Sequence, residues 1–156
     1  MNMVNFELKL LQASRIKLHK IITSLSEDQL FKIPKGFNNN VIWHIGHCIV
    51  SQQRLMYLRS NLSMYISDEL NEFFKINSSP ATWKKKPDLL EIREAILLTV
   101  EKLNEDLKND IFKTYEPLRS SMGFMINNHL EAFSYTNFHE AEHTGNIQYL
   151  IRMNES

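Results

Sequence analysis

Apolar side chains recur every three or four residues in four separate segments of the chain. This spacing places them along one face of an α-helix. Arg15 interrupts the stripe of the first segment, which consists of Val4, Leu8, Leu11, Leu18, Ile22 and Leu25. The pattern predicts four long helices, near residues 3–25, 41–60, 88–108 and 127–152.

Turn-forming residues lie between these segments. Ser26 and Gln29 are spaced as a capping box, which predicts one short helical turn. Asn40 ends a loop containing Pro34 and can cap the second helix. Ser67 can cap another short helix, through Lys75.

The remaining connections are longer, and residues 61–87 are long enough to cross over from one end of a bundle to the other. No segment shows convincing strand alternation or an internal repeat. The sequence therefore predicts an all-α fold, a four-helix bundle with longer crossover connections, formed by one domain that comprises residues 1–156.

Composition narrows the class of protein. Lys plus Arg equals Asp plus Glu at 18 each, so the chain has no general attraction to nucleic acid or to an anionic membrane. Cys48 is the single cysteine, so no disulfide can form within the chain. No secretory signal pattern and no apolar stretch long enough to span a membrane is present. These features predict a cytoplasmic protein without nucleic-acid or membrane partners.

Two histidines mark the candidate chemistry. His139 and His143 are four residues apart, which on a helix places them about 40° apart around the axis and one turn above each other. Two imidazoles do not complete a metal site, and His44 or His47 of the second predicted helix can supply a third ligand. His47 is favoured because it follows Gly46, where a neighbouring backbone can approach closely. The alternative is that these histidines are buried and satisfied by hydrogen bonds.

Other candidates are weaker. His19 is predicted to lie on the surface, and His129 lies about 15 Å of helical rise before His139. Cys48 points about 100° away from His47 and is expected to be a core residue. Residues 139–143 also match the H-E-x-x-H pattern of metalloproteases, but the longer form of that pattern fails because glycine stands at 145 rather than 146.

Three stretches together resemble the DinB-like superfamily: residues 39–47 (NNVIWHIGH), 51–53 (SQQ) and 139–147 (HEAEHTGNI). Members of that superfamily are four-helix bundles with a three-histidine metal site. The resemblance implies that His47, His139 and His143 are the ligands, and it assigns no role to His44. The superfamily includes thiol-dependent S-transferases and a thiol-dependent maleylpyruvate isomerase.

The favoured hypothesis is therefore a metal-dependent enzyme of the DinB-like type. Three imidazoles suit zinc or nickel, and an open position would activate a thiol or a water molecule for S-transfer or hydrolysis on a small molecule. A low-molecular-weight thiol and a homodimer are implied by the resemblance. Glu140 is the candidate catalytic residue, which would touch a metal-bound water; otherwise it faces solvent or supports a ligand. The alternatives are a non-catalytic, dimerising stress-related metal-binding bundle and a bundle without metal.

Overall fold

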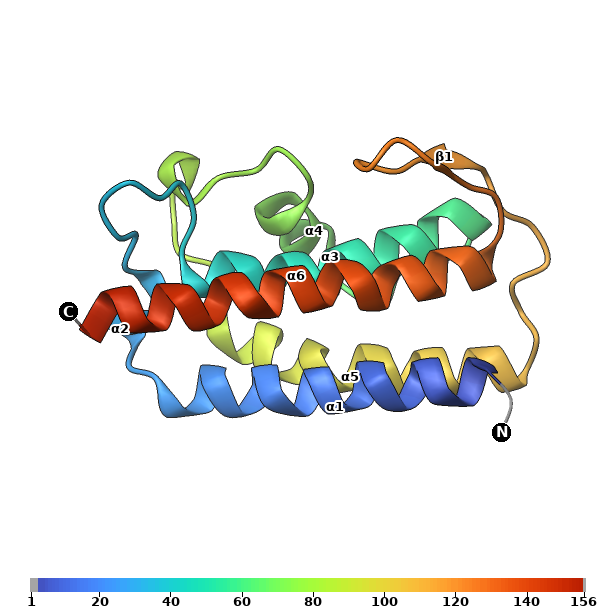
Figure 1. Ribbon diagram of the computed structural model, residues 1–156, viewed down its shortest axis with the longest axis horizontal. Coiled ribbons are helices and arrows are strands. Elements are labelled where there is room, and N and C mark those ends of the chain that lie inside the picture. The colour runs from blue at the N-terminus through green and yellow to red at the C-terminus, as the bar shows by residue number, and fades with distance from the viewer. Residues whose placement is uncertain (1–2, 156) are drawn as a thin grey trace.

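The computed structural model describes residues 3–155, and its main body is a bundle of long helices (Figure 1). These are α1 (Met3–Ser24), α3 (Val41–Met56), α5 (Leu89–Lys108) and α6 (His129–Glu155). Helix α3 lies beside α6 and runs antiparallel to it, and α1 lies beside α5 (Figure 1). The predicted all-α bundle is confirmed, although the second helix ends at Met56 rather than near residue 60.

The short elements follow from their caps. Ser26 and Gln29 form the predicted capping box at the start of α2 (Glu27–Phe31). The Asn40 side chain accepts a hydrogen bond from the Trp43 amide (2.9 Å) and begins α3. Ser67 caps α4 (Asp68–Phe74) through the Leu70 amide. Two short 3₁₀ turns complete the helical segments, η1 (Leu58–Ser60) and η2 (Pro80–Thr82).

A small hairpin was not expected from the sequence. Strands β1 (Leu118–Arg119) and β2 (Met125–Ile126) pair antiparallel, with Leu118 opposite Ile126. The prediction of no strand is therefore wrong at this hairpin. Two-residue strands are too short for an alternation of apolar and polar residues to be recognised in the sequence.

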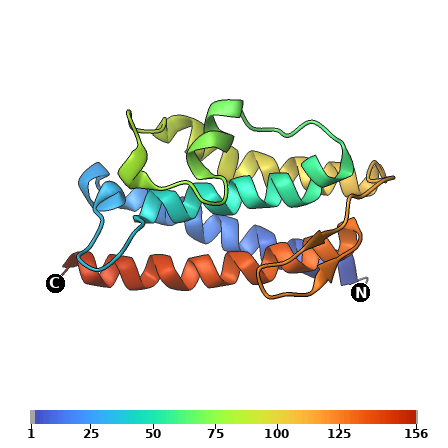
Figure 2. The same ribbon diagram turned by 90° about the horizontal axis from the view of Figure 1, so that it is seen from above.

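The connections cover the outer side of the α3–α6 pair. The segment from α3 to α5 crosses over and carries α4 across α3, while the hairpin lies over the start of α6 (Figure 2). Phe74, at the end of α4, packs directly on Gly46 of α3. Gly46 therefore permits the close approach of a neighbouring segment that was expected at this position.

The buried core lies between the long helices and is mainly aliphatic. Its fully buried side chains include those of Ile22, Ile42, Ile45, Ile49, Ile96 and Ile147. Arg15, which interrupts the stripe of α1, is also fully buried. The core therefore contains a charge that requires a partner.

Two glycine-to-alanine variants test the packing of α4 on α3. In Gly46→Ala the new Cβ would lie 2.4 Å from Cγ of the buried Phe74 ring, so we expect the free energy of unfolding to fall by about 1–3 kcal/mol. Gly145→Ala in α6 is the matched control. No atom lies within 4 Å of its Cβ position, and we expect a gain of up to about 1 kcal/mol from helix propensity. Urea unfolding measures both changes, and equal effects would contradict this packing.

Candidate metal centre

Helices α3 and α6 bring three histidines together. One nitrogen each of His47, His139 and His143 lies within 4.8 Å of the others. The Nε2 atoms of His139 and His143 are 3.1 Å apart. A tetrahedral zinc ion bonded to nitrogen at about 2.0–2.1 Å separates its ligand atoms by about 3.3 Å, so small side-chain movements are sufficient to close this site. The three residues fit a divalent metal ion.

The His47 ring is held in one orientation. Its Nδ1 lies 2.6 Å from the Phe74 carbonyl oxygen, so Nδ1 carries the proton and donates it. The lone pair is then on Nε2, where it accepts a hydrogen bond from the Ser51 hydroxyl at 3.1 Å, and a metal ion would take the place of that hydrogen. The indole of Trp43 stacks almost parallel to the imidazole, with the ring centroids 4.6 Å apart. These contacts prepare Nε2 to act as a ligand.

His44 is the fourth histidine of the cluster. Its Nδ1 lies 2.7 Å from Nδ1 of His143, which is the ring nitrogen of His143 that does not face His139. A hydrogen bond from His143 Nδ1–H to His44 would leave Nε2 of His143 with its lone pair. Sequence reasoning left His44 open as a rival ligand or a supporting residue, and this contact favours support of His143.

Burial keeps the cluster neutral. It lowers the pKa of His44 and of His139 to about 4, with a smaller contribution from the nearby His47. Burial and the three neighbouring imidazoles lower the pKa of His143 to about 2. The pKa of His47 is also lowered by burial, against the opposing hydrogen bond to Phe74. Neutral imidazoles at pH 7 are the form that binds a metal ion.

Glu140 lies in the bundle interior and is 1% exposed. The Nε group of Arg15 contacts both carboxylate oxygens, at 2.9 and 2.8 Å. Arg15 also donates to the Cys48 carbonyl (3.0 Å) and the Thr99 hydroxyl (3.3 Å). The expectation of a solvent-facing Glu140 is therefore wrong. Its catalytic role stays a prediction, and the carboxylate already has a buried partner, which sequence reasoning missed.

The remaining candidates lie outside the three-histidine group. Cys48 is buried, and its burial raises the pKa of the thiol, in agreement with the expected core role. His129 stacks on Phe112 with 5.4 Å between ring centroids. His19 is half-buried on α1 rather than fully on the surface.

A cavity of about 290 Å³ opens beside the histidines. His47 and His139 line it together with Ser51, Arg54, Arg59 and Tyr135, and the β1–β2 hairpin supplies another part of its wall. We call it the histidine cavity. A small molecule placed there would lie against two of the three candidate ligands.

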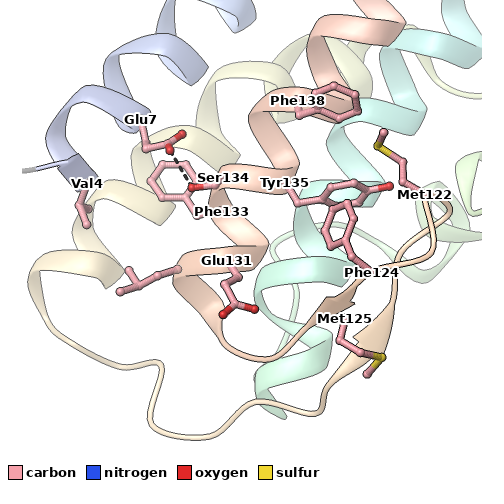
Figure 3. Close-up of a pocket in the computed structure, with 11 residues that line it drawn as sticks. Val4, Glu7, Met122, Phe124, Met125, Glu131, Phe133, Ser134, Tyr135 and Phe138 are labelled. Atoms are coloured by element: carbon pink, nitrogen blue, oxygen red, sulfur yellow. Dashed lines mark hydrogen bonds between the residues drawn. The ribbon is translucent and has the colours of Figure 1, made fainter.

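A larger, apolar cavity of about 760 Å³ lies beyond Tyr135, between the start of α1, the start of α6 and the hairpin (Figure 3). Its walls include Phe124, Met125, Phe133 and Phe138. None of the four clustered histidines lines it. Of these two cavities, the histidine cavity can bring a ligand to the candidate metal site.

Comparison with known proteins gives a match to a family model. A family model described as the DinB superfamily matches residues 10–147. A search of curated proteins gives no match. Within the described residues, no helix combines the length and apolar character needed to cross a membrane.

Acid should release the metal ion and destabilise the metal-free protein. Unfolded histidines have a pKa near 6.5, whereas His44 and His139 in the fold have a pKa of about 4. Between these values the unfolded state binds more protons, so the free energy of unfolding should fall as pH falls from 6.5 to 4. Denaturation at several pH values measures this slope, and His143→Gln should reduce it. Stoichiometric metal at strongly acidic pH would contradict the ligand set.

Glu140→Gln separates a structural role from a catalytic one. It leaves Arg15 buried without a counter-charge, so we expect a loss of about 3–5 kcal/mol in unfolding free energy. The exposed neighbour Glu142 provides the control variant Glu142→Gln, which should change little. Replacing both partners, Arg15→Met with Glu140→Met, should recover part of the loss. Lost turnover with unchanged stability would instead support catalysis by Glu140.

Proposed function

The chain belongs to the DinB superfamily, and we propose that it is a metal-dependent enzyme whose ion is held by His47, His139 and His143. The observation that carries this proposal is the convergence of three imidazole nitrogens, within 4.8 Å of one another, beside a cavity. A site built from three protein ligands leaves positions for other ligands, which is typical of catalytic rather than structural metal sites.

Three neutral imidazoles suit zinc or nickel better than magnesium or calcium. When bound, such an ion supplies Lewis acidity, which lowers the pKa of a thiol or a water molecule. The protein holds the rings in place through the Phe74 carbonyl for His47 and through His44 for His143.

The proposed reaction is S-transfer or hydrolysis on a small molecule. With a low-molecular-weight thiol, the thiolate sulfur attacks an electrophilic carbon, and a C–S bond forms as the bond from that carbon to its leaving group breaks. The leaving group departs with the bonding electrons and takes up the proton that the thiol lost. With water, a C–O bond forms in the same way and the outcome is hydrolysis. The thiol reaction is supported by the resemblance to thiol-dependent S-transferases. The size of the histidine cavity, about 290 Å³, fits small molecules rather than macromolecules.

A non-catalytic role is the alternative, in which the ion ties α3 to α6 in a dimerising bundle. A protein that loses stability without metal but turns over no electrophile in the presence of thiols would favour it. We also propose a homodimer, for which α1 offers Phe6 and Leu10, exposed at 49% and 46% and one turn apart. Sedimentation that shows only monomer over a wide concentration range would exclude the dimer.

Alanine variants test the ligand set. His47→Ala, His139→Ala and His143→Ala each leave two ligands, so we expect the affinity for zinc or nickel to fall by more than about 100-fold. His44→Ala removes the partner of His143 and should lower affinity by about 10–100-fold. Competition with a chelator measures these affinities in protein purified without a histidine tag.

His19→Ala and His129→Ala are the controls and should leave affinity unchanged, because neither residue belongs to the cluster. If His44→Ala lowers the affinity more than His47→Ala, then His44 is the third ligand. Elemental analysis showing no bound metal, together with no binding in the titration, would remove the proposed function.

A further inference from the structure

Three arginines line the histidine cavity: Arg54, Arg59 and Arg119. Among the described residues, no aspartate or glutamate lines it. Over the whole chain the two signs of charge balance at 18 each, so this local excess of positive charge is a property of the cavity rather than of the composition. A cavity lined by charges of one sign concentrates small ligands of the opposite sign.

The guanidinium groups retain donors for a ligand. Arg54 Nη1 donates to the Asn71 side-chain oxygen (3.1 Å), and Arg119 Nε donates to the Gly123 carbonyl (3.1 Å). Both acceptors are neutral, and each of these contacts engages one nitrogen of a group that has five N–H donors. Within the described residues neither arginine forms an ion pair with a carboxylate.

Arg59 has a weak partner. Its Nη1 lies 3.8 Å from the Glu116 carboxylate, and both side chains are substantially exposed, at 38% and 60%. Exposed ion pairs of this kind contribute about 0–1 kcal/mol to stability. An anion bound in the cavity can therefore replace Glu116 as the partner of Arg59 at little cost in free energy.

Ser120 provides an independent observation. It lines the same cavity, is 7% exposed, and its Oγ has no hydrogen-bond partner within the described residues. A buried hydroxyl without a partner is unfavourable. The Oγ atom is itself enclosed, and rotation about χ1 would turn the hydroxyl so that it donates to an oxygen of a bound anion.

The apolar part of the wall is formed by Leu55, Leu58, Ile76 and Leu118. Because His47 and His139 also line this cavity, a ligand with its charge at the arginines can reach the histidines with another group. We propose that the histidine cavity selects a small organic anion, with a carboxylate or phosphate bound by Arg54, Arg59 and Arg119. This inference rests on the proposed function in that the same molecule would present its thiol or its electrophilic carbon to the metal site.

The test compares two small thiols on zinc-loaded protein. Mercaptosuccinate carries two carboxylates, whereas 1-thioglycerol is uncharged. By calorimetry we expect mercaptosuccinate to bind about 10-fold or more tightly, because charge-assisted hydrogen bonds to arginine are among the stronger polar contacts. Added salt should reduce this preference, because the cavity is open to solvent.

Arg54→Gln and Arg119→Gln should each weaken mercaptosuccinate binding by about 10-fold and leave 1-thioglycerol unchanged. Arg119 is exposed, so its variant should fold normally, which circular dichroism checks. Lys35→Gln is the matched control, because it removes one positive charge from an exposed loop residue outside the cavity. Equal binding of the two thiols, or arginine variants that bind like Lys35→Gln, would overturn the proposal.

Metal-free protein separates this proposal from the proposed function. In metal-free protein we expect succinate or inorganic phosphate to bind, and we expect Arg54→Gln to weaken that binding. The anion that binds more tightly identifies whether the cavity prefers a carboxylate or a phosphate. If the protein binds no metal but still binds one of these anions, the metal enzyme fails and the anion site stands. If it binds metal but neither anion, and shows no preference between the thiols, the anion site fails alone.

Discussion

The arrangement of the bundle depends on one buried ion pair, Arg15 with Glu140. Arg15 is fully buried on α1, and its guanidinium contacts three other helices: Glu140 on α6, the Cys48 carbonyl on α3 and Thr99 on α5. Removing one partner of such a pair leaves a charge without compensation in the core, a loss of about 3–5 kcal/mol. Rotations of α6 that turn Glu140 away from Arg15 are therefore strongly disfavoured.

The same ion pair also determines where the candidate metal ligands point. His139 directly precedes Glu140, and His47 directly precedes Cys48, whose carbonyl accepts from Arg15. Neighbouring residues of a helix point about 100° apart, so fixing Glu140 towards α1 turns His139 towards α3. The same guanidinium thus fixes both the rotation of α6 and the position of α3 against it. The candidate metal site does not include the ion pair, but the positions of its histidines depend on how the ion pair orients α3 and α6.

Local patterns in the sequence were sufficient for the helices and for part of the site. The three-to-four spacing and the caps at Ser26, Asn40 and Ser67 involve residues close in the chain, so they could be read directly. The pairing of Arg15 with Glu140 joins residues 125 positions apart, and a lone arginine in an apolar stripe was its one signal. His44 against His143, and the arginines that η1 and the hairpin bring to the cavity, likewise depend on contacts between distant segments.

Gly46 links the packing of the bundle to the chemistry of the site. A glycine inside a helix is less favourable than alanine by about 1 kcal/mol, and here it leaves room for the Phe74 ring. Because Phe74 approaches so closely, its carbonyl oxygen lies 2.6 Å from Nδ1 of His47 and fixes the proton there. With a side chain at position 46, α4 would have to move outward. His47 would then lose its hydrogen bond to the Phe74 carbonyl, which keeps the proton on Nδ1 and leaves Nε2 to face His139 and His143. A residue without a side chain therefore helps to orient a metal ligand one position further along the helix.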